Sequence, residues 1–515
     1  MVEPFRNEAL TDFSKPESSE AFEAALRKVR DQLGAKHSCW IGGEEITTSG
    51  ELVSRDPGET ETVVGIWPKC GVEEAEQAIR AADAAFPEWS ERTAAERAQF
   101  LFDAAELMRR RKHEFSALMV YEVGKNRAEA DADTAEAIDF LEFYAREALR
   151  YAEPQPVTPI PGEKNELFYI PLGVGAIIPP WNFPLAILVG MTTAALVAGN
   201  TVVLKPASDS PTIGGAFVDL MREVGLPGGV LNYLTGPGAL AGEHLVNHPR
   251  TRFISFTGSK AVGLGIIEKA ARMAPGQIWI KRVVAEMGGK DGIYVDADCD
   301  LEAAVRGVVA SAFGYSGQKC SACSRAIVHE TVYDRFVEEL AALTSELVVA
   351  HPSRPEASLG PVSSENAYKK ILDYIEIGKG EGRLIAGGDK APGNGFYIRP
   401  TVFADVAPEA RIMQEEIFGP VLAVCKVADF EEGTKVFNGT EYGLTGAIYS
   451  NDRAHLDYAK RRFHVGNLYL NRKCTGALVG GQPFGGFNMS GTDSKAGGRD
   501  YLLLFLQAKS VSEKI

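Results

Sequence analysis

Four short apolar runs between residues 174 and 256 alternate with longer helical patterns. These runs have the length and β-branched content of strands, and they are Val174–Ile178, Thr201–Leu204, Val230–Leu234 and Phe253–Phe256. Strands separated by helices form βαβ units, in which the strands lie parallel in one sheet and helices cover both faces. A second region with this alternation begins near Val284 and continues to about Pro483. The pattern therefore predicts an α/β protein built from doubly wound parallel sheets.

Helical patterns occupy much of the first 152 residues. They cover residues 20–33, 72–86, 93–111 and 129–151, and Pro87 is the expected end of the second. The residues Thr93-Ala94-Ala95-Glu96 form a capping box at the start of the third. A proline-rich passage follows from Glu153 to Pro171, and its prolines suit an exposed arm or an edge hairpin. A helical N-terminal region thus precedes an arm and the first α/β region.

Length and charge restrict the possible partners. A chain of 515 residues exceeds one ordinary hydrophobic core, so two or three domains are expected. The net charge of −15 argues against binding to nucleic acid or to an anionic membrane. The basic run Arg109–Lys112 closes a helical pattern, where cations complement the helix dipole. Residues 168–204 carry no charge, but prolines and asparagines divide them into pieces too short to span a bilayer. We therefore expect a small-molecule partner, and neither nucleic acid nor a membrane.

Seven cysteines are scattered along the chain, without the even number and the spacing of a disulfide framework. The N-terminal sequence also lacks the apolar core of a signal peptide. A reducing compartment, the cytoplasm, is the expected location. Cys320 and Cys323 form a CxxC pair, but a metal or thioredoxin-like site would need a second pair or a redox context. No metal site is predicted.

Cys320 is the candidate nucleophile. It lies in the segment FGYSGQKCSACS, whose small residues let the backbone approach a reacting group closely, and its own N–H is available to an oxyanion. The alternative is that Cys320 is simply a small buried apolar residue. Glu286, in AEMGGK, is a candidate base. Asn182 lies in PWNFP between two prolines, where its amide is either an oxyanion donor or the cap of the following helix.

Glycine-rich turns provide a weaker signal for a nucleotide site. GPGALAG (residues 236–242) follows an expected strand and precedes an expected helix, so it can place backbone near a pyrophosphate. Its last glycine comes one residue later than in the usual Rossmann fingerprint, and a plain turn before a helix is the alternative. FTGSKAVG (residues 256–263) repeats the arrangement. Lys205 ends an expected strand, where α/β folds bind ligands, although a solvated lysine is common there.

Seven segments together resemble the aldehyde dehydrogenase superfamily in order and approximate spacing, over nearly the whole chain. They are PWNFP, KPAS, FTGS, EMGGK, FGYSGQKC, EEIFGP and PFGGFNMSG. The resemblance implies a Rossmann-type NAD-binding domain (residues 1–152 and 172–282) and an α/β catalytic domain (residues 283–482). It also implies a small β oligomerisation arm (residues 153–171 and 483–515) and a homodimer or higher homo-oligomer.

The same resemblance implies a catalytic mechanism and a cofactor. Cys320 would attack the aldehyde, Asn182 and the Cys320 N–H would hold the oxyanion, and Glu286 would activate the water that hydrolyses the thioester. Ser208 stands where an acidic residue would repel a 2′-phosphate, so we expect NAD to be preferred and NADP tolerated. The residues implied in cofactor binding are Ile178, Pro180, Trp181, Lys205, Ser208, Gly238, Thr257, Gly258, Ser259, Glu416 and Phe418.

The segments GQKCSACSR and TGALVGGQPFGGFNMSGTDSKAGG are similar to a stand-alone bacterial subgroup that oxidises L-glutamate γ-semialdehyde to glutamate, in the second step of proline degradation. In that subgroup the resemblance places the substrate carboxylate on a serine and on backbone amides. The residues implied are Glu136, Phe183, Lys319, Ser321, Gly476, Ala477 and Phe484. For Lys319, an ordinary ion pair is the alternative. Rival interpretations are a dehydrogenase of another acidic semialdehyde such as succinate semialdehyde, a hydrolase that needs no nicotinamide, and a non-catalytic binding protein on the same fold.

Overall fold

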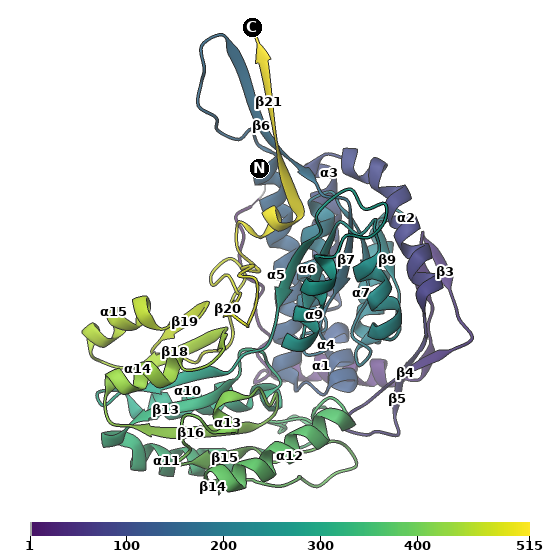
Figure 1. Ribbon diagram of the computed structural model, residues 1–515. Coiled ribbons are helices and arrows are strands. Elements are labelled where there is room, and N and C mark those ends of the chain that lie inside the picture. Colours follow the sequence, from purple (N-terminus) through teal and green to yellow (C-terminus); the bar gives the residue numbers. More distant parts are fainter. Residues whose placement is uncertain (1–2) are drawn as a thin grey trace.

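The computed structural model of this chain describes residues 3–515, and its body consists of two seven-stranded sheets with helices on both faces (Figure 1). Five strands of the first sheet are β7 (Val174–Ile178), β8 (Thr201–Leu204), β9 (Leu231–Tyr233), β10 (Phe253–Thr257) and β11 (Arg282–Glu286). Two N-terminal strands, β2 (Cys39–Ile41) and β3 (Glu44–Ile46), complete the order β11-β10-β7-β8-β9-β2-β3. The α/β class and the four expected strands are confirmed, each strand to within one residue at either end.

The order of the parallel strands in the first sheet reverses between β7 and β10. The chain proceeds from β7 to β8 and β9 on one side, and then returns to add β10 and β11 on the other. All five strands run parallel to their neighbours among these five. In such a sheet, ligands bind outside the carboxyl ends of the strands at the point of reversal. The segments that follow Ile178 in β7 and Thr257 in β10 therefore flank the expected ligand crevice.

The alternation of side chains along each strand divides the first core into two layers. Ile177 of β7 packs beneath one group of helices, whereas Val174 and Ala176 pack beneath the other. The first group comprises α3 (Ala94–Arg110), α4 (Lys112–Val123), α5 (Arg127–Ala152), α6 (Ala186–Val197) and α7 (Pro211–Glu223). The second comprises α2 (Val72–Glu91), α8 (Glu243–Asn247) and α9 (Lys260–Ala270).

The second sheet has the order β14-β15-β16-β13-β12-β18-β19, and only the edge strand β14 (Arg383–Ala386) pairs antiparallel. Its other strands are β12 (Asp291–Val295), β13 (Cys323–His329), β15 (Thr401–Ala404), β16 (Val421–Val427), β18 (Thr445–Tyr449) and β19 (Asn467–Leu470). Helices α10 (Leu301–Phe313) and α11 (Glu330–Ser345) cover one face. The other face is covered by α12 (Glu365–Glu381), α13 (Arg411–Gln414), α14 (Phe430–Asn438) and α15 (Arg453–Arg462).

Helix α2 is longer than the sequence pattern predicted. Helix α2 continues through Pro87 to Glu91, so the prediction that Pro87 ends the helix is wrong. Proline costs the helix one hydrogen bond, but one more turn buries Trp89, whose indole N–H donates to the Leu196 carbonyl at 3.0 Å. Tertiary packing therefore outweighs the local signal. Helix α1 (Pro16–Arg30) starts earlier than expected, and a small sheet of β1 (Ala35–Lys36), β5 (Val63–Pro68) and β4 (Glu51–Arg55) lies beyond it.

A long two-stranded arm projects from the body (Figure 1). It consists of β6 (Glu163–Pro171) and β21 (Leu506–Lys514), which pair antiparallel over their whole length. The arm expected from the sequence also includes residues 483–505, which take no part in the pairing of β6 with β21. There, β20 (Phe487–Asn488) pairs with β17 (Tyr442–Gly443), and Tyr501–Phe505 packs into the first core. Among residues 3–515, no helix combines the length and the apolar content needed to cross a membrane.

Candidate active site

Two cavities meet at Cys320. The larger has an empty volume of about 1190 Å³ and is lined by the segments after β7, β8 and β10 and by residues 416–418. The smaller, of about 850 Å³, lies between α5, α6 and the segment around Ala496. Cys320 lines both cavities, together with Thr257 and Met287. A molecule in either cavity would thus lie next to the Cys320 side chain.

The backbone before Cys320 is held in a sharp left-handed turn. Tyr315, Ser316 and Gly317 have φ angles of 50°, 54° and 69°. For residues with a Cβ, this conformation costs about 1–3 kcal/mol each, so surrounding contacts must hold it. The Tyr315 hydroxyl donates to the Val123 carbonyl at 2.7 Å, and the Ser316 hydroxyl donates to the Gly360 carbonyl at 2.8 Å. The loop that presents Cys320 is therefore fixed before any ligand binds.

Burial dominates the electrostatics of Cys320. It raises the pKa of the thiol far above its ordinary value, and the negative charges of Asp291, Glu286 and Glu416 raise it further. The neutral thiol is therefore the resting form at neutral pH, and the nucleophilic thiolate needs a proton acceptor or a nearby positive charge.

Glu286 is the last residue of β11 and lines the smaller cavity with Cys320. Its carboxylate accepts hydrogen bonds from the Gly486 N–H at 3.2 Å and from the Ser494 hydroxyl. Burial raises its pKa to about 7, although those hydrogen bonds act in the opposite direction. A carboxyl that is half ionised at neutral pH is suited to general base catalysis.

Asn182 is buried in the loop after β7 and lines the larger cavity. Its side-chain amide donates to the Gln318 carbonyl at 3.0 Å, two residues before Cys320. An amide nitrogen has two N–H groups, so one remains for an oxyanion while the other fixes the side chain. The sequence anticipated a donor at this position but not the bond that orients it.

Nine of the residues expected to bind the cofactor line the larger cavity: Ile178, Pro180, Trp181, Lys205, Thr257, Gly258, Ser259, Glu416 and Phe418. Ser208 and Gly238 are not among its lining residues. Lys205 Nζ donates to the Pro206 carbonyl at 2.9 Å, and burial lowers its pKa to about 8. Glu416 accepts from the Gly289 N–H at 3.0 Å. A buried lysine with N–H groups to spare and a carboxylate in the same cavity, at the carboxyl ends of parallel strands, fit the ribose hydroxyls of a dinucleotide.

The smaller cavity brings together six of the residues expected to bind substrate: Glu136, Phe183, Ser321, Gly476, Ala477 and Phe484. Lys319 is not among its lining residues, because its Nζ pairs with Glu129 at 2.6 Å. Burial, and next the charge of Asp133, raises the pKa of Glu136 to about 8. Glu136 is thus an acid that a cationic ligand group would ionise. The rest of the wall is largely apolar, with Phe140, Tyr144, Ile187, Met191 and Tyr501.

Sequence reasoning missed several residues of this site. Ser494 and Gly486 bind Glu286 but lie about 200 positions away in the chain. Lys370 lines the larger cavity and donates to the Glu416 carbonyl at 3.0 Å. Ser494 lies in the segment TGALVGGQPFGGFNMSGTDSKAGG, whose similarity to the family was the only sequence feature that pointed to it. Lys370 lies in an ordinary amphipathic helix, and nothing in its local sequence distinguishes it.

Comparison with known proteins identifies a family and several close relatives. The sequence profile of the aldehyde dehydrogenase family matches residues 45–511. A relative named 1-pyrroline-5-carboxylate dehydrogenase, from Geobacillus sp. strain WCH70, is 58% identical over 513 residues, with 100% of both chains covered. The structure of a point mutant of Thermus thermophilus 1-pyrroline-5-carboxylate dehydrogenase superimposes with a TM-score of 0.98 at 52% identity, covering 100% of both chains. A structure of 1-pyrroline-5-carboxylate dehydrogenase from Thermus with bound NAD gives the same TM-score of 0.98, the same 52% identity and the same 100% coverage of both chains.

Proposed function

The chain belongs to the aldehyde dehydrogenase family, and we propose that it oxidises L-glutamate γ-semialdehyde to L-glutamate with reduction of NAD. The semialdehyde is in equilibrium with 1-pyrroline-5-carboxylate, and the reaction is the second step of proline degradation. The observation that carries the proposal is the position of Cys320 at the junction of two cavities. One cavity holds Lys205 and Glu416, and the other holds Glu136 and Gly476. The names of the full-length relatives support the same substrate.

The first covalent step joins the Cys320 sulfur to the aldehyde carbon. As the C–S bond forms, the thiol proton passes to the ionised carboxylate of Glu286, which lines the same cavity, and from there to solvent, while the carbonyl oxygen becomes an oxyanion. The free N–H of Asn182 and the Cys320 backbone N–H are the donors proposed for that oxyanion. Because Gln318 already orients the Asn182 amide, this donor needs no rearrangement when charge develops.

NAD, when bound in the larger cavity, supplies the hydride acceptor that converts the Cys320 adduct into a thioester. Lys205 and Glu416 hold the two riboses in this proposal, and Thr257, Gly258 and Ser259 lie at the diphosphate. Glu286 then takes a proton from water, the hydroxide attacks the thioester carbon, and the Cys320 sulfur leaves as thiolate. A pKa of about 7 gives Glu286 a large ionised fraction at neutral pH.

The smaller cavity is proposed to select the amino-acid end of the substrate. The Ser321 hydroxyl and the backbone amides at Gly476 and Ala477 receive the α-carboxylate, since residues with small or no side chains permit close approach. Glu136 pairs with the α-ammonium, whose charge favours ionisation of this buried acid. Lys319 acts indirectly, as the cation that neutralises Glu129.

Cofactor preference, assembly and location follow as separate parts of the proposal. NAD is preferred and NADP tolerated, because Ser208 presents no carboxylate to a 2′-phosphate. The arm makes a homodimer or a higher homo-oligomer, and the exposed apolar side chains of Phe168 and Val511 on its two strands support such a contact. A cytoplasmic location is supported by seven free cysteines. Two of them, Cys39 and Cys70, are neighbours without a disulfide, and the Cys70 thiol donates to the Cys39 sulfur at 3.6 Å.

The deciding experiment compares aldehydes that differ at one group. Glutarate semialdehyde has the chain length and carboxylate of the proposed substrate and lacks only the α-ammonium. We expect kcat/KM for glutamate γ-semialdehyde to exceed that for glutarate semialdehyde by about tenfold to a hundredfold, the value of one buried charge-assisted contact. Glu136→Gln should remove most of this difference. Equal rates with both aldehydes, or faster oxidation of succinate semialdehyde, would overturn the substrate while leaving the family chemistry intact.

A further inference from the structure

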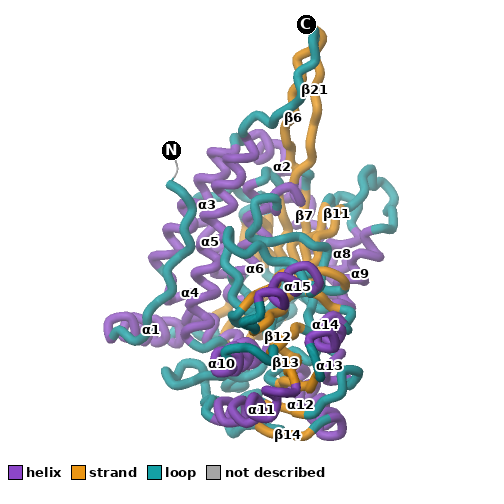
Figure 2. The backbone as a smooth tube through the Cα atoms, turned by 90° about the vertical axis from the view of Figure 1, so that its left-hand side faces the viewer, coloured by secondary structure: helices purple, strands orange, loops and turns teal. Residues whose placement is uncertain are grey.

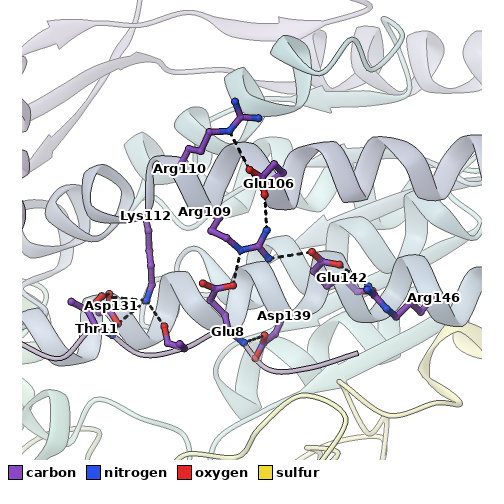
Figure 3. Close-up of polar contacts among 11 residues, drawn as sticks. Glu8, Thr11, Glu106, Arg109, Arg110, Lys112, Asp131, Asp139, Glu142 and Arg146 are labelled. Atoms are coloured by element: carbon purple, nitrogen blue, oxygen red, sulfur yellow. Dashed lines mark hydrogen bonds and ion pairs between the residues drawn. The ribbon is translucent and has the colours of Figure 1, made fainter. Parts of the chain in front are cut away.

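An extended N-terminal segment, residues 3–15, crosses the outer side of α5 before α1 begins. Figure 2 shows this segment, which we call the N-terminal strap, running beside α3, α5 and α4. Its contacts are polar and repeated, and Figure 3 shows those around Glu8, Thr11, Asp131 and Asp139. Lys112 Nζ, for example, donates to the Ala9 carbonyl at 2.8 Å. The strap is therefore bonded to the helical body at several points along its length.

One of these points is a clasp around Asp139 of α5. The carboxylate accepts from the Asn7 side-chain amide at 2.7 Å and from the Glu8 backbone N–H at 2.6 Å. Asp139 is only 4% exposed. A buried carboxylate with two charge-assisted hydrogen bonds fixes both partners firmly. Asn7 is thereby held in one orientation against the helix.

The same Asn7 amide nitrogen also donates to the Val479 carbonyl at 3.0 Å. Val479 belongs to residues 476–480, which we call the anchor loop, and Gly476 and Ala477 of this loop line the smaller cavity. A second contact lies next to the first, since Phe5 packs edge-on against Phe143 of α5 with ring centroids 5.1 Å apart. A Cβ added to Gly480 would lie 3.2 Å from the Phe5 ring. The strap thus touches the anchor loop and α5 at once.

Helix α5 also forms a wall of the smaller cavity, through Glu136 and Phe140. These residues lie within one helical turn of Asp139. Asn7 therefore joins α5, one helical turn from Glu136, to the anchor loop, three residues from Gly476, through its bonds to Asp139 and Val479. We propose that Asn7 is a positioning residue that sets the separation between Glu136 and Gly476, and hence the fit of the amino-acid end of the substrate. This inference rests on the proposed function for the identity of that substrate.

The strap contains a matched control. Thr11 binds Asp131 of α5 through its N–H at 2.8 Å and its hydroxyl at 2.6 Å, and Lys112 Nζ completes that clasp at 3.0 Å. This second clasp also holds a buried carboxylate of α5, but its bonds join only the strap, α4 and α5 and do not reach the anchor loop. Thr11→Val therefore loosens the strap without breaking the bridge to the anchor loop.

The experiment measures KM and kcat for Asn7→Ala and Thr11→Val with glutamate γ-semialdehyde and with propanal, which has no amino-acid end. We expect Asn7→Ala to raise KM for the semialdehyde about tenfold, with kcat changed less than about twofold and KM for propanal unchanged. Thr11→Val should leave both KM values unchanged. Hydrogen exchange provides a second readout, because the amides of residues 476–482 should exchange faster in Asn7→Ala than in Thr11→Val.

Three results would overturn the inference. They are equal exchange rates of residues 476–482 in the two variants, a parallel rise of KM for both aldehydes, and the same change of KM in Thr11→Val. If the wild type itself rejects glutamate γ-semialdehyde, the proposed substrate is wrong, and the exchange rates alone decide whether Asn7 holds the anchor loop. The two failures are thus distinguishable.

Discussion

At the scale of single residues, the site depends on two acids and a thiol that burial holds away from their ordinary ionisation. Burial raises the pKa of Glu286 to about 7 and that of Glu136 to about 8, and it keeps Cys320 as a neutral thiol. The two acids therefore have pKa values close to neutral pH, whereas the thiol needs a proton acceptor before it can react. Perturbed groups gathered around one cavity are typical of a catalytic site.

The pH dependence of thioester hydrolysis should report Glu286. The base acts when deprotonated, and its pKa is raised, so activity should be present above about pH 7 and lost as the pH falls through that value. Ser494→Ala removes a hydrogen bond that favours the charged form and should move the midpoint upward by about one unit. A pH profile of kcat for both enzymes measures this. A midpoint near the ordinary value of a carboxyl, or one that Ser494→Ala leaves in place, would contradict the role of Glu286.

At the scale of elements, the turn at residues 314–317 determines where the nucleophile lies. Gly317 has a φ of 69°, and a Cβ added there would lie 2.2 Å from the Gly419 carbonyl oxygen. Gly225 has a similar φ of 82° but no atom within 4 Å of an added Cβ. Alanine at Gly225 therefore measures the free-energy cost of the left-handed backbone alone, and alanine at Gly317 measures that cost together with the cost of the steric clash.

Gly317→Ala should therefore cost more than Gly225→Ala. We expect about 1 kcal/mol for Gly225→Ala, from the left-handed conformation alone, and about 3 kcal/mol or more for Gly317→Ala, together with a loss of kcat/KM of at least about a hundredfold. Thermal unfolding and steady-state kinetics of both variants check this. Full activity in Gly317→Ala would mean that the turn does not position Cys320.

Local pattern predicted the elements well where a short-range rule decides the structure. Four of the seven strands of the first sheet, β7, β8, β9 and β10, were predicted to within one residue, because alternation with helices identifies them. The capping box at Thr93 starts α3 as expected. Prediction was wrong at Pro87, where a distant contact of Trp89 decides the outcome. The partners of Glu286 and Lys319 were beyond prediction for the same reason, since Ser494 and Glu129 approach them only in the folded chain.

At the scale of the whole molecule, the carboxyl ends of β7, β10 and β11 face the loop between α10 and β13, which carries Cys320. The resemblance to the family predicted residues that line the two cavities, and the structure shows that the two cavities meet at Cys320. The arm projects away from the two large sheets, and its strands β6 and β21 pair only with each other (Figure 1). The outer edges of this two-stranded sheet pair with no other strand of the described chain, and in the proposed homo-oligomer they would contact a second copy.

Removal of residues 507–515 should abolish the assembly. Without β21, the strand β6 loses its partner, so the arm cannot form and the protein should sediment as a monomer. Removal of residues 513–515 alone keeps most of the pairing and serves as the control. Analytical ultracentrifugation of the three proteins decides the matter, and an unchanged sedimentation coefficient after the longer deletion would show that the arm does not hold the assembly together.

The central claim is that Cys320 carries the covalent intermediate and Glu286 hydrolyses it. Rapid mixing of Glu286→Gln with NAD and glutamate γ-semialdehyde, followed by mass spectrometry of the intact and digested protein, tests this most directly. We predict a burst of about one NADH per subunit, slow further turnover, and a glutamyl adduct on the peptide that contains Cys320, with neither burst nor adduct in Cys320→Ala. A burst without an adduct on Cys320, or an adduct that persists in Cys320→Ala, would contradict the account.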